Sequence, residues 1–556
     1  MARKHKPCCD SEKIRRVAVW GFIIRRRDIF ESIWEQISQE RNMYSILVLM
    51  FLCVGCLSAV KVIVLSQNIN SHIIYHARIA RLLADEGHVV EMIVPSNVKI
   101  PVVMKEGNVG ILWYTVPTNE TFPNTKEASR MISESVMANW AFERLAKKIR
   151  FLKMGMDHWA VECSALLNDE SIRMHLFNTK YDIAIVDPAA LKCHVSLLYQ
   201  MKIPIILLGI VPMDWTLRIP SLPSFVPSLF STFGESMSFL ERLQNTLIHF
   251  ASEMLFIVLA AQSLPGTNPP ARVSDVFNTV QLNFVLDDIS ISYPKPAMSN
   301  FIYIGDAIPE AVKTLPKEIE AFVQSAQDGV IIVSFGSYFD YLPSEVNTKL
   351  CSAFKQIPQR VVWKLKNKTA CDADANKVML LDWLPQNDLL SHGNVKLFIS
   401  HCGINSILES VYHSTPILAF PASLDQPHNA RRLANLGLGY EMNLRDFSTD
   451  DLTSKISAIL SDETILKNIR RASELMRKRP DKPGRRLSYW VQHVVDYGSN
   501  HLKTKAYELN IFQFWCFDVL LALVIILGLT TSLLGLCLKL AYKRVMNCLR
   551  NKSKTE

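Results

Sequence analysis

The sequence predicts an α/β protein with two facing doubly wound domains, followed by one C-terminal transmembrane helix. Three observations lead to this fold class. Short apolar runs alternate with helical stretches along most of the chain, as is typical of parallel strands joined by crossover helices. The number of such runs in the 556 residues requires two sheets. An apolar segment without any charge then follows near the C-terminus.

The chain begins with an extension, residues 1–42, and continues with an apolar segment, residues 43–60. The apolar run is about 17 residues long and ends in small residues such as Ser58 and Ala59, which favours a cleaved signal peptide. A signal-anchor that stays in the membrane is the alternative. Because Met43 stands directly before the run, translation can start at Met1 or at Met43, and N-terminal sequencing of the native protein would decide between them.

The first domain is expected over residues 61–305, with a helix at 73–86 and a linker at 291–305 that contains two prolines. Its buried strands are expected at 60–65, 88–95, 183–186 and 203–209. Residues 213–260 contain an apolar, helix-like stretch that is compatible with contact to a membrane surface and equally with an ordinary core helix.

The second domain is expected over residues 306–512 and repeats the same pattern. Its buried strands are expected at 329–335, 361–365, 378–380, 396–400 and 416–420. Two Rossmann-like domains that face each other leave a cleft between the carboxyl ends of their strands, and we expect the ligands to bind there.

The C-terminal apolar segment, residues 519–538, has the length of a membrane-spanning helix, and its basic flank predicts a cytosolic tail at 539–556. Lys552 and Lys554 stand five and three positions from the end, as in a dilysine signal for retrieval to the endoplasmic reticulum. With a signal peptide, this predicts a single-pass type I protein of that membrane whose body is lumenal. Asn119 and Asn367 stand in glycosylation sequons of that body.

Charge and cysteine usage exclude several classes of function. The net charge of +9 lies entirely in residues 1–42 and 539–556, so the body has no charge excess for binding nucleic acid. Five of the 12 cysteines fall in the body; their spacing predicts no metal site and about one disulfide, with the pairing left open. The dinucleotide fingerprint G-x-G-x-x-G is absent, which disfavours a hydride-transfer enzyme.

A polar motif follows the strand expected at 396–400. It runs from His401 through Gly403, Asn405 and Ser406 to Glu409 and opens a helix. Free backbone N–H groups and the positive end of the helix dipole at such a place can cradle a phosphate without a metal. A simple helix cap is the alternative for this loop taken alone.

The 44 residues Trp383–Gln426 around this loop resemble the signature of the UDP-glycosyltransferase family, and most closely its animal membrane-bound UDP-glucuronosyltransferases. The resemblance extends more loosely from Lys61 through the tail. It implies the fold called GT-B, a UDP-sugar as co-substrate, no cofactor or metal, and a small lipophilic acceptor, with a homo- or hetero-oligomer left open.

The resemblance also implies roles for individual residues. It makes Trp383 the stacking partner of uracil, with Gln386 near the base edge, and places Glu409 on the ribose hydroxyls. The diphosphate would be held by Ser337, His401, Gly403, Asn405 and Ser406. Asp425 and Gln426 would bind the sugar hydroxyls. An aromatic face for a base, N–H donors for a phosphate and a carboxylate for a diol are chemically suited to these tasks.

His72 closes the loop after the first strand, where the family has the general base that takes the acceptor's proton. Asp187 ends another strand and would orient that imidazole. His76 and His88 are the competing histidines. An isolated histidine is more often structural, but its position at a strand end, with an aspartate ending a second strand, favours His72.

Three small residues replace family glycines: Asn70, Cys402 and Ser414. Asn tolerates a left-handed backbone, and small side chains should preserve donor binding. Glucuronosyltransferases carry an arginine before the linker, whereas residues 281–288 here hold two acids and no base, which favours UDP-glucose over UDP-glucuronate. The predicted function is inverting sugar transfer in conjugation metabolism. A non-catalytic member that binds UDP-sugar or lipid as a partner subunit is the alternative.

Overall fold

The computed structural model describes residues 59–98, 107–117, 126–138, 141–188, 191–209, 221–277, 279–336 and 342–552. The N-terminal extension, nearly all of the apolar segment 43–60, Ser337, the sequon at Asn119 and Lys554 lie outside the described residues.

The first domain is built on a seven-stranded sheet in the order β3-β2-β1-β4-β5-β6-β7, and every neighbouring pair is parallel. The strands are β1 (Lys61–Leu65), β2 (Val89–Pro95), β3 (Val109–Tyr114), β4 (Ile183–Val186), β5 (Ile205–Gly209), β6 (Val280–Val285) and β7 (Phe301–Tyr303). The strand order reverses between β1 and β4, so the loops after these two strands diverge and open a crevice.

The linker expected at 291–305 is wrong in part. Residues 301–303 form β7, whose Phe301 pairs with Asn283 of β6, so they complete the first sheet. A run of three residues that includes Tyr303 is too short for a pattern of alternation to indicate a strand. The chain leaves the first domain through the 3-10 turn Gly305–Ala307.

The second domain is built on a six-stranded parallel sheet in the order β10-β9-β8-β11-β12-β13. Its strands are β8 (Val330–Ser334), β9 (Arg360–Lys364), β10 (Val378–Leu381), β11 (Val395–Ser400), β12 (Ile417–Ala419) and β13 (Gly439–Glu441). The order again reverses, here between β8 and β11. The five strands expected in this half are confirmed to within a few residues.

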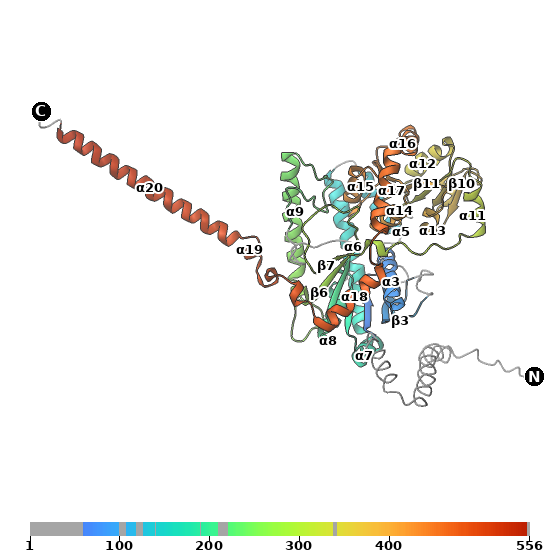
Figure 1. The fold of residues 1–556 in the computed structure, drawn as a ribbon, viewed down its shortest axis with the longest axis horizontal. Helices are drawn as coiled ribbons and strands as arrows, with labels where there is room; N and C mark the ends of the chain where they lie inside the picture. Colours follow the sequence, from blue (N-terminus) through green and yellow to red (C-terminus); the bar gives the residue numbers. More distant parts are fainter. Residues whose placement is uncertain are drawn as a thin grey trace, which may run out of the picture. The chain divides into compact units, whose positions relative to one another are not determined.

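Helices surround both sheets (Figure 1). Those of the first domain are α3 (Asn70–Asp85), α5 (Lys126–Met137), α6 (Ala141–Asn168), α7 (Glu170–Asn178), α8 (Leu191–Met201), α9 (Phe239–Ala260) and α10 (Val273–Phe277). Those that follow are α11 (Lys317–Gln324), α12 (Ser344–Gln356), α13 (Gln386–Leu390), α14 (Ile404–Tyr412), α15 (Gln426–Asn435), α16 (Thr449–Ser461), α17 (Glu463–Arg477), α18 (Pro483–Tyr497), α19 (Ile511–Phe514) and α20 (Phe517–Lys552).

Helix α18 follows the helices of the second domain and ties the chain back to the first domain. It packs against α3 of the first domain. Arg486 of α18 forms an ion pair with Asp306 at 2.8 Å. Arg479, which precedes this helix, forms a second ion pair with Asp288 at 2.7 Å. All four side chains are at most 13% exposed, so these pairs are shielded from solvent and hold a defined geometry.

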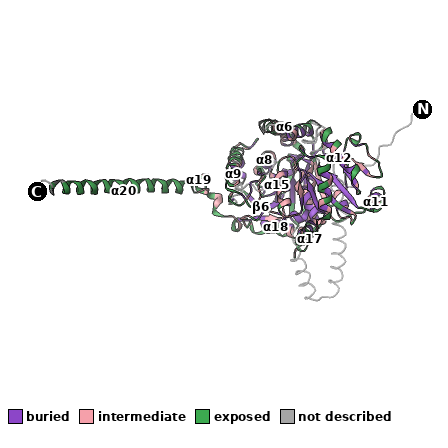
Figure 2. Ribbon diagram, turned by 90° about the horizontal axis from the view of Figure 1, so that it is seen from above, coloured by how far each residue is buried: buried purple, intermediate pink, exposed green. Residues whose placement is uncertain are grey.

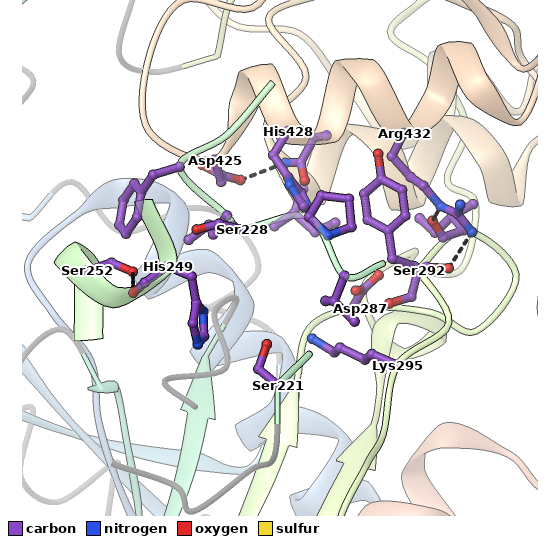
Figure 3. A pocket seen from close by; sticks show the side chains of 18 of the residues that line it. Ser221, Ser228, His249, Ser252, Asp287, Ser292, Lys295, Asp425, His428 and Arg432 are labelled. Carbon is purple, nitrogen blue, oxygen red and sulfur yellow. Dashed lines mark hydrogen bonds between the residues drawn. The ribbon is translucent and has the colours of Figure 1, made fainter. Parts of the chain in front are cut away.

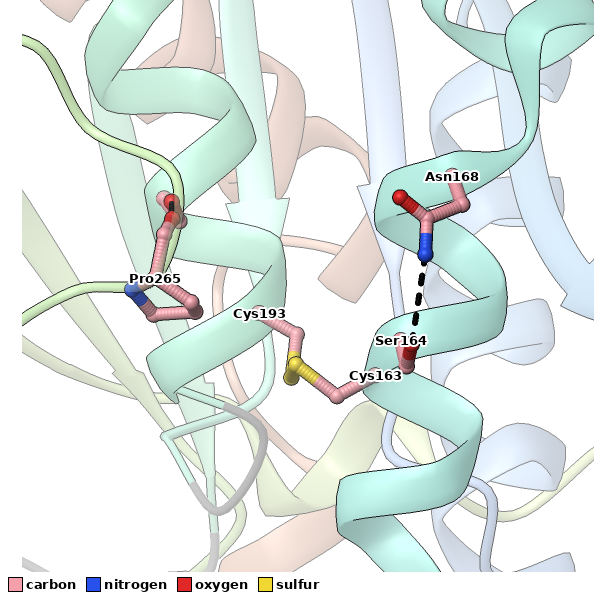
Figure 4. The surroundings of a disulfide bond; sticks show 6 residues. Cys163, Ser164, Asn168, Cys193 and Pro265 are labelled. Carbon is pink, nitrogen blue, oxygen red and sulfur yellow. Dashed lines mark hydrogen bonds between the residues drawn. A yellow bond between two sulfur atoms is a disulfide. The ribbon is translucent and has the colours of Figure 1, made fainter.

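The apolar strands form the core of each domain, which Figure 2 shows as purple ribbons beneath less buried helices. The described part of the chain contains two disulfides, Cys163–Cys193 and Cys351–Cys371, where the sequence predicted about one. The first joins α6 to α8 (Figure 4). Pairing depends on Cα atoms close to 5.5 Å apart, which the spacing in the sequence does not reveal. Cys402 remains a buried thiol.

Among the described residues, α20 is the one helix that is long and apolar enough to cross a membrane, and its candidate span is Phe517–Leu549. It includes the segment 519–538 expected to span. Asn367 is exposed at the start of a short 3-10 turn and accepts a hydrogen bond from Thr369.

Candidate active site

His72 and Asp187 meet at the point where the strand order of the first sheet reverses. His72 lies in the first turn of α3, just after β1, and Asp187 directly follows β4. The imidazole Nδ1 is 2.6 Å from Asp187 Oδ2. Asp187 Oδ2 also accepts hydrogen bonds from the Tyr75 hydroxyl at 3.2 Å and the Gln67 amide at 3.4 Å. Donation from Nδ1 to the carboxylate leaves Nε2 as the basic nitrogen of His72.

The two competing histidines have structural partners. His76 is fully buried, its Nδ1 lies 2.9 Å from the His72 carbonyl, and burial lowers its pKa to about 4. His88 stands at the start of β2, where its Nδ1 accepts from the Val60 amide and its Nε2 contacts Ser488. His88 is therefore at the amino end of the sheet, away from the cleft.

The three residues that replace family glycines differ in backbone conformation. Cys402 and Ser414 have φ values of 63° and 62°, so both occupy the left-handed region that favours glycine. The expectation for Asn70 is wrong, because this residue begins α3 after the extended residue Ile69. A helix start needs no left-handed residue, so the asparagine there causes no strain.

The loop after β11 leads into α14 with its first turn open. Gly403 is the N-cap of α14, and no side chain caps that helix end. The simple helix cap that was the alternative reading is therefore absent from this described part of the chain. The N-terminal N–H groups of α14 and its dipole offer a place for an anion.

His401 is held between two glycine backbones beside this helix end. A Cβ atom on Gly336 would lie 2.5 Å from the imidazole, and one on Gly403 would lie 2.8 Å from it. Burial, followed by the charge of Lys364, lowers the pKa of His401 to about 4. The ring is thus neutral near pH 7, and it can offer a hydrogen bond to a phosphate but no positive charge.

Lys364 supplies the charge that His401 lacks, and sequence reasoning missed it. It ends β9, donates from Nζ to the Gly336 carbonyl at 2.8 Å, and lies 5.5 Å from the ring centre of Trp383. Trp383 itself is 58% exposed, so one face of the indole is available to a base. A lysine at the carboxyl end of a predicted strand was the signal that could have found this residue.

Gln386, Ser406 and Glu409 form one network across α13 and α14. Gln386 Nε2 donates to Glu409 Oε2 at 2.6 Å and to Ser406 Oγ at 3.2 Å. Burial raises the pKa of Glu409 to about 7, and the bond from Gln386 opposes this shift. Near pH 7 the group is thus partly protonated, and Gln386 orients the carboxyl oxygens that could accept from a diol.

Asp425 is the N-cap of α15, and Gln426 is the first residue of that helix. Burial raises the pKa of Asp425. Its Oδ2 accepts from Asn429 Nδ2 at 2.7 Å, and the same nitrogen lies 3.1 Å from the Cys402 carbonyl. Gln426 Oε1 accepts the amides of Ala422 and Ser423. Asn429, which the sequence did not single out, thus connects the predicted sugar-binding and phosphate-binding loops.

The two domains meet beside His72. Asn405 Nδ2, in the first turn of α14, donates to the carbonyl of Ser71 at 3.3 Å. The charge of His72 also acts on Asp425, where it counteracts the increase in pKa. The structure therefore brings the His72–Asp187 pair and the open end of α14 to one place, with Asn405 as the bridge.

A pocket extends from Asp425 into the first domain (Figure 3). The start of α15 supplies Asp425, His428 and Arg432, while α9 supplies His249, Ser252 and Glu253 on the other side. The segment after β6 adds Asp287 and Lys295, and residues 226–230 add apolar side chains. His72 is not among its lining residues. No group of three or more His, Cys, Asp or Glu side chains in the described ranges is arranged to hold a metal ion.

Comparison with known proteins identifies the family. The family model described as "UDP-glucoronosyl and UDP-glucosyl transferase" matches residues 60–554. The chain belongs to this family. UDP-glucuronosyltransferase 1A9 of Mus musculus is 31% identical over 379 residues, which cover 65% of this chain and 71% of that protein.

Other relatives of this UDP-glycosyltransferase cover more of the chain or carry other names. UDP-glucuronosyltransferase 2C1 of Oryctolagus cuniculus is 28% identical over 478 residues, covering 82% of this chain and 93% of that protein. The Rattus norvegicus 2-hydroxyacylsphingosine 1-beta-galactosyltransferase is 27% identical over 383 residues, with coverages of 67% and 70%. A UDP-glucosyltransferase structure from Polygonum tinctorium aligns with a TM-score of 0.55 at 15% identity, covering 79% of this chain and 99% of that one, which confirms the GT-B fold.

Proposed function

We propose that this UDP-glycosyltransferase transfers glucuronic acid or glucose from the UDP-sugar to a hydroxyl of a small lipophilic acceptor, with inversion and without a metal or cofactor. The contact of Asn405 with Ser71 carries the proposal, because it sets the open end of α14 one residue from His72. A base and an anion site on opposite domains are what a direct displacement requires.

In the proposed reaction, Nε2 of His72 removes the proton from the acceptor hydroxyl. The oxygen attacks the anomeric carbon as the bond from that carbon to the UDP oxygen breaks, so the configuration inverts. The proton stays on His72, where the Asp187 carboxylate at 2.6 Å stabilises the imidazolium. The departing diphosphate gains negative charge, which the N-terminus of α14 and Lys364 would stabilise.

The donor would lie along the carboxyl edge of the second sheet. Trp383 would stack on uracil, Gln386 would orient Glu409 on the ribose, and the sugar would meet Asp425 and Gln426. The diphosphate would be held by Ser337, His401, Gly403, Asn405 and Ser406. When the donor binds, Asn405 would exchange its bond to Ser71 for a phosphate oxygen.

The charge of the pocket bears on the identity of the sugar. The expectation of UDP-glucose relied on two acids and no base in residues 281–288. Asp288 is neutralised by Arg479, however, and Lys295 reaches the pocket from beyond that stretch. Lys295 would bring positive charge to a uronate carboxylate, beside the buried Asp287 that lines the same pocket and interacts with this lysine. The relatives named as glucuronosyltransferases favour the same donor.

We further propose that the catalytic body is lumenal in the endoplasmic reticulum, anchored by α20 and glycosylated at Asn119 and Asn367. The apolar length of Phe517–Leu549 and the basic residues after it support this topology. The test is to add protease outside sealed microsomes: the glycosylated body should be protected from cleavage.

The proposed reaction is tested by acceptor-dependent UDP release from UDP-glucose and UDP-glucuronate, with a mixture of phenols and the full chain in membranes. His72→Ala should lower kcat by about 10²- to 10⁴-fold and leave UDP binding intact. The exposed His501, in the 3-10 turn Asn500–Leu502, offers a matched control, and His501→Ala should behave like the parent. UDP binding without release from either donor would instead support a non-catalytic partner subunit.

A further inference from the structure

Helix α9 carries an apolar stripe that faces outward. Seven large apolar side chains on it are between 47% and 70% exposed: Phe239, Leu240, Leu243, Leu247, Met254, Leu255 and Val258. Their spacing places them within one half of the helix circumference. From Leu243 to Ala260 the only charged residue is Glu253, which is 4% exposed, so solvent-accessible charge near the stripe is confined to the first turn of the helix, at Glu241 and Arg242.

A neighbouring loop extends the stripe. Asn245 of α9 is fully buried, accepts from the Ser228 amide at 2.7 Å, and donates to the carbonyls of Pro223 and Val226. These three bonds hold residues 222–230 against α9. The loop exposes Leu222, Phe225 and Phe230 by 43% to 50%. We call the seven residues of α9 and these three the α9 surface.

The opposite side of α9 has a different character. His249, Ser252 and Glu253 line the pocket beside Asp425 (Figure 3). One helix therefore presents polar groups to the pocket and apolar groups to the outside. An apolar face of this size on a water-exposed protein marks a binding surface for another apolar phase.

The position of the membrane helix argues for lipid as that phase. The ring of Trp515, two residues before α20, lies 5.8 Å from His249 and 5.5 Å from Phe250 of α9. The exposed Phe512 and Leu509 precede Trp515. The middle of α9 is thus in ring contact with the chain segment that enters the membrane.

We propose that the α9 surface docks on the lipid bilayer as a second membrane contact, separate from the spanning helix α20. An amphipathic helix with an uncharged apolar face lies in the interface of a bilayer. Phe230 belongs both to this surface and to the pocket lining, so the docked surface opens the pocket toward the lipid. A lipophilic acceptor would then pass from the bilayer to the pocket, a consequence that depends on the proposed function.

The docking is tested with the full chain reconstituted in phosphatidylcholine liposomes that contain a diazirine-labelled phospholipid. After illumination, peptides are mapped by mass spectrometry. Lipid should attach to peptides from α20, from 239–260 and from 221–231, and not to α12 of the second domain. Labelling of 239–260 at no more than the level of α12 would overturn the proposal.

A double variant, Leu247→Glu with Leu255→Glu, changes two exposed side chains and should leave the fold intact. It should reduce lipid attachment to α9 by roughly tenfold while attachment to α20 stays constant. The matched control is Val312→Glu with Leu475→Glu, whose parent side chains are 56% and 55% exposed. The control should label like the parent.

Two further outcomes are decisive. If α9 is unlabelled and the double variant converts a dimer to a monomer, the surface is a contact between copies and the lipid proposal fails. For the acceptor route, the double variant should raise KM several-fold for a long-chain alkylphenol and leave KM for UDP-sugar and a water-soluble phenol unchanged. Because labelling requires no turnover, it decides docking even if no acceptor is transferred.

Discussion

The substitution Asp187→Asn examines the proposed base without removing it. The Asp187 side chain is 1% exposed and accepts from His72, Tyr75 and the Gln67 amide. An asparagine has nearly the same shape, and its oxygen can still accept from His72 Nδ1. The change therefore removes the negative charge that stabilises the imidazolium and preserves most of the packing.

The size of the effect follows from the geometry. Removing the charged partner from a buried pair costs about 3–5 kcal/mol. Here this cost appears only when His72 has taken the proton, 2.6 Å from the carboxylate. At 1.36 kcal/mol per tenfold change in rate, kcat should fall roughly 10²- to 10⁴-fold. KM for the UDP-sugar should not change, because the donor is held by the other domain.

The assay measures kcat and both KM values with the full chain in liposomes, together with UDP affinity and thermal stability. Asp182→Asn is the matched control, because Asp182 precedes the same strand, is exposed, and accepts only the Lys61 amide among the contacts described. A folded Asp187→Asn protein with kcat within about threefold of the parent would refute the reasoning. An equal loss in Asp182→Asn would show that the effect is structural.

Three further predictions concern the donor half. Trp383→Ala should weaken UDP binding by about 1–3 kcal/mol in calorimetry and leave the melting temperature unchanged, since the indole is exposed; unaltered affinity would exclude stacking. Gly403→Ala should reduce UDP affinity about tenfold or more, because its Cβ displaces His401, whereas Gly393→Ala, with open space around it, should bind normally. Glu409 has a pKa raised to about 7, so the stability that its neutral form contributes below about pH 4.5 should be lost as the pH rises through 7. Melting curves of Glu409→Gln should lack this decline, and an identical pH profile would contradict the assignment.

The sequence predicted the site best where the chemistry is local. The loop from His401 to Glu409 follows a strongly apolar strand, so the reversal of strand order brings it to the cleft. His72 and Asp187 were also predicted as the residues that follow two strands, and the structure places them 2.6 Å apart. Parallel strands align their carboxyl ends, and this rule makes such pairs predictable.

The sequence did not reveal contacts that depend on the mutual arrangement of the domains. The bond from Asn405 to Ser71 joins residues 334 positions apart, and the pair of Arg479 with Asp288 joins residues 191 apart. The latter pair also neutralises one of the two acids on which the preference for UDP-glucose was based, whereas the other, Asp287, lines the pocket. No local pattern encodes such partners.

Two other failures have physical causes in chain geometry. The strands at 109–114, 301–303 and 439–441 were not predicted, since they lie at sheet edges where burial is incomplete. The strand at 280–285 is mostly buried, but the polar Gln281 and Asn283 interrupt its apolar run. The second disulfide was missed because cysteine pairing depends on proximity in the fold.

In the proposed reaction, an acceptor oxygen that His72 deprotonates displaces UDP directly. The most direct measurement is the anomeric configuration of the product, read from the proton coupling constant by NMR after turnover of a UDP-sugar with an α-linkage. We expect a β-linked glycoside, formed by the parent chain and not by His72→Ala. A product that retains the α-configuration would require a covalent intermediate on the enzyme, and it would contradict the assignment of His72 as the base of a single displacement.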